Sequence, residues 1–255
     1  MLLNNIQIRE IFHFFFLKEL LRISDPALYI LKGGVNLRFF FNSPRYSEDM
    51  DLDVIGGSVE TLKKNGYKIL NDKAFLRKLQ SFNIAGLKIN DPEKAKHTET
   101  TQRFRLRIVK ESGEELASKV EFSRRKLEEQ DAYISENINS EIARAYKQIS
   151  FFTQHYKGEY AFLQKVKALA GRAQVQVRDI FDIFILDLAA YCDKTLIQKL
   201  EIEILEKAQE ELLSISYKDY QGQVLEFLDD NHRKEFGSPE FFKSLQERVL
   251  ELISL

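Results

Sequence analysis

The sequence has few of the residues that mark disulfide-rich, membrane-bound or cysteine-metal proteins. It contains a single cysteine, Cys192, among 255 residues, so it can form neither an internal disulfide nor a cluster of cysteine metal ligands. We expect Cys192 to be a buried structural thiol inside an apolar helix. A chain with so little cysteine fits the reducing cytoplasm.

No part of the chain is both long and free of charge. The most apolar segment, residues 1–23, carries Arg9, Glu10, Lys18 and Glu19 and lacks a small-residue cleavage site, unlike a signal peptide or a membrane span. Its apolar residues recur at roughly helical spacing, which predicts an amphipathic helix that docks on a core. We therefore expect a cytoplasmic protein with no membrane partner.

The chain also lacks an excess of charge of either sign. It has 38 basic and 39 acidic residues, for a formal net charge of −1, which gives no global attraction to a polyanion. Any contact with nucleic acid must therefore come from a local basic patch. Apolar residues make up 44% and charged residues 30%, a composition typical of folded globular proteins.

The pattern along the chain changes in its middle, so we predict an α+β protein of two domains. In the first part, alternating and apolar runs predict strands of a mixed sheet, at residues 27–34, 49–57, 103–109 and 117–123. From about residue 140 onward, proline and glycine almost vanish and long helical patterns follow. We place a mixed sheet with flanking helices in residues 1–135 and an all-helical domain in residues 136–255.

The segment DMDLDV places three carboxylates on one face of a predicted strand. Side chains two residues apart share a strand face, so Asp49, Asp51 and Asp53 lie together. Neighbouring charges of this kind repel by roughly 3 kcal/mol unless a cation lies between them, which favours a divalent metal such as Mg²⁺. Upstream, Gly33 and Gly34 separate a strand from a helix, where bare backbone N–H groups can approach phosphate oxygens.

Two other interpretations of the acidic segment stay open. The first is a solvated strand face, which is what an isolated acidic alternation more commonly indicates. An isolated glycine pair likewise more commonly indicates only a tight turn. The second is a calcium loop, because the three aspartates and Glu60 stand at positions 1, 3, 5 and 12 of that pattern. Position 6, however, is Val54 where the loop needs glycine, and Pro44 interrupts the helix that should lead into it.

Several motifs in order give the chain a recognisable family pattern. The segments LKGGVNLR, RYSEDMDLD, KVEFSRR, KVKALAGR and VRDIFD, between about residues 30 and 186, resemble those of the AbiEii/AbiGii-type nucleotidyltransferase toxins, a branch of the polymerase-β-like nucleotidyltransferase superfamily. The resemblance implies a nucleotidyltransferase domain with a glycine pair on the phosphates and an acidic pair on metal. It also implies a following helical domain that completes the site.

The resemblance assigns roles to particular positions of this chain. It implies catalytic residues Asp49, Asp51, Glu121, Lys165, Asp179 and Asp182, nucleotide-binding residues Gly33, Gly34, Arg45, Ser47 and Lys119, and metal ligands Asp49 and Asp51. Lys167 is the reserve for Lys165, and the sequence does not decide between the last two aspartates. Val35 and Asn36 depart from the family, which usually has small hydroxyl-bearing residues after the glycine pair.

The function that the resemblance implies is magnesium-dependent transfer of a nucleoside monophosphate from a nucleoside triphosphate to an acceptor. Transfer RNA or another RNA is the acceptor, and a cognate antitoxin is the partner, by resemblance. Three arginines, Arg103, Arg105 and Arg107, share one face of a predicted strand, and Lys110, Lys119, Arg124, Arg125 and Lys126 follow. This basic region fits an RNA backbone or a charged edge strand. The alternative is a nucleotide- or metal-binding interaction module without turnover.

Overall fold

A computed structural model describes residues 3–91, 95, 97–124, 131–192 and 194–254. The chain forms two compact units, the first made of Met1–Phe39 and Tyr46–Tyr156 and the second of Phe40–Arg45 and Lys157–Leu255. The division after Tyr156 lies beyond the boundary near residue 135 that composition suggests. It lies there because two further strands after residue 132 complete the sheet of the first unit.

The first unit is built on a 7-stranded mixed sheet with the order β3-β4-β5-β2-β1-β7-β6. Its strands are β1 (Tyr29–Lys32), β2 (Asp49–Val54), β3 (Ile84–Ile89), β4 (Thr101–Lys110), β5 (Glu115–Ser123), β6 (Tyr133–Asn137) and β7 (Phe152–Tyr156). Its helices are α1 (Asn5–Ile23), η1 (Pro26–Leu28), α2 (Gly33–Phe40), α3 (Val59–Leu70), α4 (Lys73–Gln80) and α5 (Ser140–Ala145). The predicted α+β fold is confirmed, although β7 replaces helix at the start of the expected helical half.

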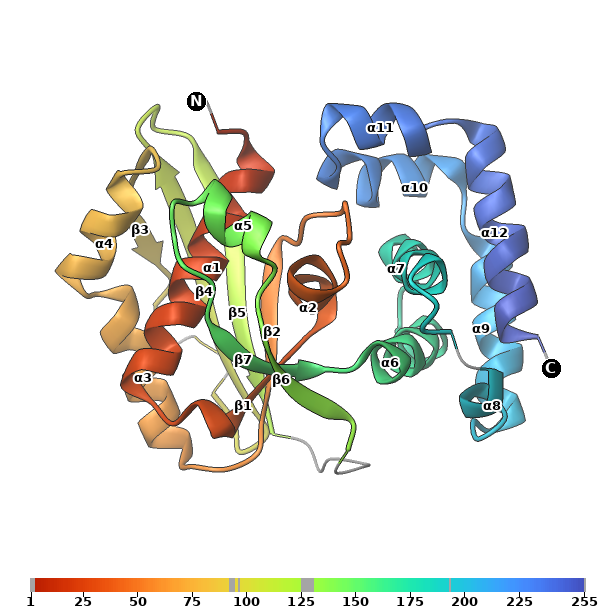
Figure 1. The fold of residues 1–255 in the computed structure, drawn as a ribbon, viewed down its shortest axis with the longest axis horizontal. Helices are drawn as coiled ribbons and strands as arrows, with labels where there is room; N and C mark the ends of the chain where they lie inside the picture. The colour runs from red at the N-terminus through yellow and green to blue at the C-terminus, as the bar shows by residue number, and fades with distance from the viewer. Residues whose placement is uncertain (1–2, 92–94, 96, 125–130, 193, 255) are drawn as a thin grey trace. The chain divides into compact units, whose positions relative to one another are not determined.

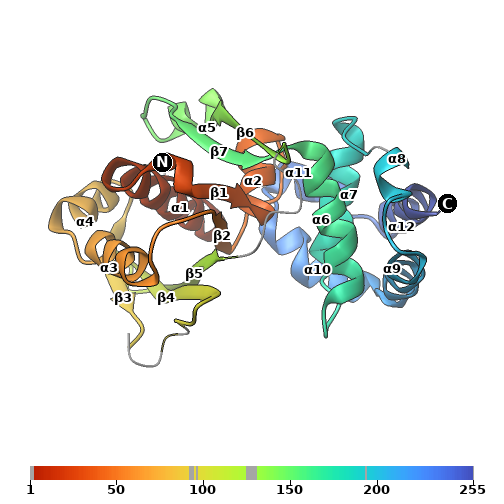
Figure 2. The same ribbon diagram turned by 90° about the horizontal axis from the view of Figure 1, so that it is seen from below.

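One face of the sheet is apolar and covered by helices, and the other is polar. Helices α1, α3 and α4 pack on the apolar face (Figures 1 and 2). On β4, Phe104, Leu106 and Ile108 are buried on that face, while the arginines between them lie on the opposite one, as the alternation predicts. On β2, Met50 and Leu52 are also fully buried, so the aspartates between them lie on the polar face.

Helix α1 is more deeply buried than an amphipathic helix. It begins with a capping box, in which the Asn4 side chain accepts from the Gln7 N–H and the Gln7 side chain accepts from the Asn4 N–H. Residues on every side of the helix are buried, including Glu10 and Glu19. Ion pairs compensate for these charges, since Arg38 Nε lies 2.5 Å from the Glu10 carboxylate.

Within the described residues, no helix has the length and apolar character needed to cross a membrane.

The second unit is helical over its described residues. Its helices are α6 (Gly158–Gly171), α7 (Val177–Leu188), α8 (Lys194–Ile197), α9 (Ile202–Ser214), α10 (Tyr217–Gln223), η3 (Leu225–Phe227), α11 (Asp230–Phe236) and α12 (Pro239–Ile253). Phe181, Tyr220 and Phe236 form part of an aromatic core between α7, α10 and α11. This unit therefore has its own apolar interior.

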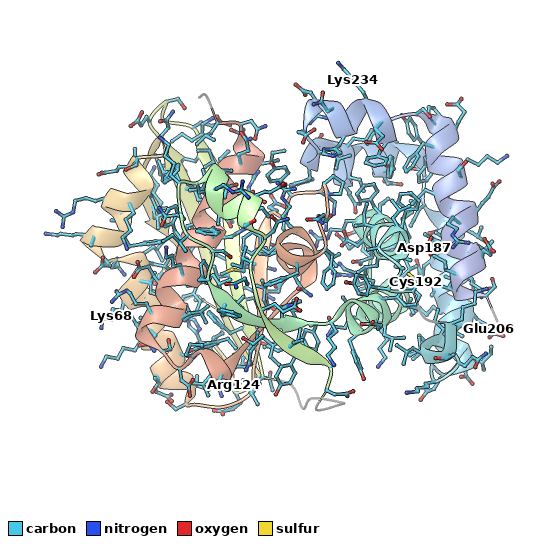
Figure 3. The ribbon with its side chains drawn as sticks, in the orientation of Figure 1. Lys68, Arg124, Asp187, Cys192, Glu206 and Lys234 are labelled. Carbon is cyan, nitrogen blue, oxygen red and sulfur yellow. The ribbon has the colours of Figure 1, made fainter. Side chains whose placement is uncertain are left out.

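Cys192 differs from the sequence prediction. It lies four residues after the end of α7, in an irregular segment, and it is half-buried rather than enclosed in an apolar helix. Figure 3 shows Cys192 beside Asp187. Burial raises the pKa of the Cys192 thiol to about 12, and the Asp187 charge adds to the rise. The thiol is therefore protonated and unreactive at neutral pH.

Candidate active site

The polar face of the sheet brings the predicted carboxylates and cations onto three adjacent strands. In the parallel pair β2–β5, Asp49 stands opposite Lys119 and Asp51 stands opposite Glu121. In the antiparallel pair β1–β2, Lys32 stands opposite Asp51. Because residues opposite one another share a face, these side chains form one cluster of alternating charge.

The third aspartate of β2 is fully engaged by protein groups. The Lys32 Nζ lies 2.5 Å from Asp53 Oδ1, and the Tyr156 hydroxyl donates to Asp53 Oδ2 at 2.7 Å. Asp53 is only 6% exposed, and each of its oxygens has a protein partner. The alternation alone could not separate Asp53 from its two neighbours, and only the family resemblance left it out of the predicted metal pair.

Asp49 and Asp51 are less engaged. Lys119 Nζ lies 3.2 Å from Asp49 Oδ2, and no hydrogen bond or ion pair from the described residues reaches the Asp51 carboxylate. Burial raises the pKa of Asp51. Lys119 and Lys32 oppose this rise, and the charges of Asp49 and Glu121 add to it. A carboxylate that burial and like charges destabilise in this way would be stabilised by a bound cation.

Gly33 begins α2 directly beside Asp51. Its φ is +69°, a left-handed conformation that glycine adopts without strain. A Cβ at this position would lie 3.3 Å from Asp51 Oδ2 and 3.8 Å from Asp51 Cβ. The absence of a side chain therefore keeps one edge of the carboxylate open and exposes the first N–H groups of the helix, where an anion is favoured. Gly34 is the next residue of the same turn.

The residues present fit a magnesium ion held by two carboxylates and completed by substrate phosphates and water. Asp49 and Asp51 supply hard oxygen ligands on one strand face, and the space left by Gly33 borders one of those oxygens. Within the described residues, no group of 3 or more acidic, histidine or cysteine side chains is arranged to bind a metal by itself.

Glu121 lies next to this pair but is already ion-paired. Arg103 Nε lies 2.5 Å from Glu121 Oε2, and Lys119 Nζ lies 3.7 Å from the same oxygen. Burial alone would raise the pKa of Glu121, but the Arg103 hydrogen bond and the nearby cations lower it overall. Its predicted catalytic role stays a prediction, with Arg103 as a partner that sequence reasoning did not assign to it.

The calcium-loop interpretation is inconsistent with the structure. The three aspartates lie on strand β2 rather than in a loop, and Glu60 is exposed at the start of α3. Asp53, which such a loop requires as a ligand, instead binds Lys32 and Tyr156.

Two positions near the glycine pair have structural partners. Ser47 Oγ donates to the Asp49 carbonyl at 2.8 Å, which supports the chain where it enters β2. Asn36 is 1% exposed, and its side-chain amide donates to the Tyr156 carbonyl at 3.0 Å. Of the two positions that depart from the family pattern, Asn36 therefore joins α2 to β7.

A second predicted cluster lies inside the helical unit. Lys165 Nζ on α6 is 2.9 Å from Asp179 Oδ1 and 2.6 Å from Asp182 Oδ2, both on α7. Arg45 binds the Asp182 carboxylate with both Nε and Nη2, at 3.0 and 2.8 Å. Arg172 Nε lies 2.9 Å from Asp179 Oδ2, although without hydrogen-bond alignment. In these contacts three cations face two carboxylates.

Burial and charge act in opposite directions on this cluster. Asp182 is fully buried, which alone would raise its pKa, but the charges and hydrogen bonds of Arg45 and Lys165 outweigh burial and lower it. Asp182 therefore remains ionised and orients Lys165. The same lysine also contacts Asp179. The sequence left open which of the two aspartates has the predicted role, and in the structure both contact Lys165.

Arg45 and Arg172 both belong to this cluster, although the sequence analysis assigned neither of them to it. Arg45, predicted to bind nucleotide, is 2% exposed and lies in the helical unit against Asp182. Arg172 was not selected, although it ends KVKALAGR, the sequence pattern that singled out Lys165. Lys167 is half-buried on the same helix. The spacing of that pattern was thus the signal that would have found Arg172.

A mixed sheet with paired carboxylates beside a glycine-initiated helix defines the chain as nucleotidyltransferase-like. The chain belongs to the AbiEii family, because the family model described as "Nucleotidyl transferase AbiEii toxin, Type IV TA system" matches residues 16–252. The predicted resemblance is confirmed, and the protein is an enzyme of the nucleotidyltransferase class. Membership of a toxin–antitoxin family implies a nucleoside triphosphate substrate and a cognate antitoxin.

Solved structures of the same fold extend over nearly the whole chain. JHP933 from Helicobacter pylori is 18% identical with a TM-score of 0.53, and the match covers 98% of this chain and 93% of that one. A putative nucleotidyltransferase from H. pylori is 17% identical with a TM-score of 0.53, covering 98% and 96%. MenT4, a nucleotidyltransferase toxin from Mycobacterium tuberculosis, is 15% identical with a TM-score of 0.58, covering 96% and 82%. No curated protein sequence matches the chain.

Proposed function

We propose that this toxin moves a nucleoside monophosphate from a nucleoside triphosphate to a hydroxyl of an RNA acceptor such as transfer RNA, with Mg²⁺ as cofactor. We place this activity in the cytoplasm, where a cognate antitoxin counters it. The single observation that carries the proposal is the Asp51 carboxylate, which has no partner from the described residues and faces Gly33 at the start of α2.

We assign the metal to Asp49 and Asp51 and the phosphates to the α2 N-terminus. When bound there, Mg²⁺ supplies charge neutralisation of the leaving pyrophosphate and activation of the attacking hydroxyl. Gly33 and Gly34 present backbone N–H groups to phosphate oxygens. Lys119, whose Nζ lies 3.2 Å from the Asp49 carboxylate, adds a positive charge beside them.

In the helical unit we assign Lys165 as a phosphate-binding cation. Asp179 and Asp182 both contact its ammonium, and Arg45 and Arg172 also contact these two carboxylates. A lysine fixed in this way is pre-organised, so little side-chain entropy is lost when it binds an anion. The two aspartates act on the substrate through Lys165 in this assignment.

The polar face of β4 supports a polyanionic acceptor. Arg105 is exposed and makes no ion pair with the described residues, and it stands opposite Lys119 across β4–β5. Arg107 stands opposite Lys88 across β3–β4, and both contact the Glu115 carboxylate. The predicted basic residues Arg125 and Lys126 lie outside the described residues.

The test is transfer of radiolabel from each α-labelled nucleoside triphosphate to total transfer RNA in the presence of Mg²⁺. We expect label on RNA with the wild type and a loss on the order of 10³-fold for Asp51→Asn. Asp187→Asn is the matched control, because it makes the same change at an ion pair with Arg248 in the helical unit. Equal transfer by wild type and Asp51→Asn would refute the metal assignment.

The acceptor class is tested in the same experiment. Gel separation after nuclease or protease treatment shows whether the label is carried by RNA or protein. Label that survives nuclease and disappears with protease would refute an RNA acceptor while leaving nucleotidyl transfer intact.

A further inference from the structure

Lys32 and Asp53 are two charged residues beside the proposed metal carboxylates that no assigned role explains. We propose that Asp53 is a positioning residue that holds the Lys32 ammonium away from Asp51 and so keeps Asp51 available to the metal. This inference rests on the proposed function, because it concerns how strongly Asp49 and Asp51 bind a divalent cation.

The register places Lys32 nearest to Asp51 rather than to Asp53. Lys32 is the last residue of β1 and stands directly opposite Asp51 in the antiparallel pair, whereas Asp53 is its diagonal neighbour. Directly opposite Cβ atoms lie about 4.5–5.5 Å apart and diagonal ones about 7–8 Å. The ammonium nevertheless lies 2.5 Å from Asp53 Oδ1, so the lysine reaches past the nearer carboxylate.

The Asp53 carboxylate is itself locked in place. Its second oxygen accepts a hydrogen bond from the Tyr156 hydroxyl at 2.7 Å, and the Tyr156 carbonyl accepts from the Asn36 amide at 3.0 Å. Asp53 is 6% exposed, and the Lys32 side chain is 17% exposed. The ion pair therefore has one geometry that the surrounding side chains define, unlike a surface pair of two mobile chains.

This pairing separates the charges on the polar face. Lys32 and Asp53 neutralise each other, so the negative charge of Asp51 is not cancelled by a contact with a lysine of its own protein. Without Asp53, the nearest carboxylate for the Lys32 ammonium is the one directly opposite, at Asp51. A lysine bound there would occupy the position that a metal ion needs.

The substitution Asp53→Asn tests this directly. The amide is nearly isosteric and its oxygen still accepts from Tyr156, but it no longer forms an ion pair with Lys32. We expect the affinity for a divalent cation to fall on the order of tenfold. Adding Lys32→Met removes the competing ammonium, so the double variant should regain affinity close to that of the wild type.

The experiment measures binding of Mn²⁺ alone, an ion with the same preference for carboxylate oxygens as Mg²⁺. The electron paramagnetic resonance signal of the free ion reports how much Mn²⁺ is unbound. Wild type, Asp53→Asn, the double variant and the control Asp187→Asn are compared at equal folded fraction, checked by circular dichroism. Weaker binding in the single variant with recovery in the double variant supports the inference.

Lys32→Met alone separates the inference from a merely structural role for Asp53. The inference predicts Mn²⁺ binding at least as tight as that of the wild type, because no ammonium then competes for Asp51. A structural role predicts weaker binding, because the Asp53 carboxylate then lacks its cation.

The outcomes separate the inference from the proposed function. Normal binding by Asp53→Asn, or no recovery in the double variant, overturns the role of Asp53 while the metal site stands. Absence of Mn²⁺ binding by the wild type overturns both the metal assignment and this inference.

Discussion

Replacing Gly33 by alanine tests the candidate site with the addition of one carbon atom. The backbone of Gly33 has φ +69°, and an alanine in this left-handed conformation costs about 1–2 kcal/mol. The new Cβ would also lie 3.3 Å from Asp51 Oδ2, where it would exclude a metal ligand or a phosphate oxygen. We expect divalent-ion affinity to fall about tenfold and label transfer to fall on the order of 100-fold, because small displacements at a reacting centre have large effects.

Gly113 provides a matched control for this substitution. It has φ +85° in the turn between β4 and β5, and a Cβ added there meets no atom within 4 Å. Gly113→Ala therefore has the same backbone cost without the contact, and it should lose about 1–2 kcal/mol of stability with unchanged transfer. Denaturant unfolding and label transfer are measured on both variants. If Gly33→Ala loses the same stability but keeps full transfer, Gly33 is only a turn residue and the reasoning is refuted.

Two further predictions concern stability. Burial lowers the pKa of His13 from 6.5 to about 3, with a smaller effect of the Arg9 charge. The contribution of His13 to stability is therefore complete above about pH 6.5 and falls below it by up to about 1.4 kcal/mol per pH unit. His13→Gln should flatten this decline of the denaturant midpoint with pH, and an unchanged slope would contradict the assignment. Arg45→Met leaves the buried Asp182 carboxylate short of one cation, and it should lower the free energy of unfolding in urea by about 3 kcal/mol. The control Arg248→Met, at an exposed pair, should lower it by less than about 1 kcal/mol. Equal losses of stability would show that burial does not govern the strength of these pairs.

Much of the fold could be predicted because its causes are local. The alternation of Phe104, Leu106 and Ile108 with arginines defines both β4 and the face that it buries. The glycine pair before an apolar helix likewise predicts the turn from β1 into α2. The segment from residue 136 to 156 was predicted less well, because β6 and β7 are short strands that become part of the sheet only by pairing with residues far away in the sequence.

The sequence by itself determined which chemical groups this protein has and in which order they occur, since the motifs that indicate the AbiEii family can be read without a structure. Only the tertiary structure gave the physical reason why Asp53 differs from the two aspartates that the motifs assign to the metal. Asp53 is bound by Lys32 and Tyr156, while Asp51 has no partner from the described residues. The tertiary structure likewise placed Arg45 against Asp182, which lies 137 positions further along the chain. Alternation specifies the face of a strand on which a side chain lies, but the partner that it meets depends on the register between strands and on contacts between distant segments.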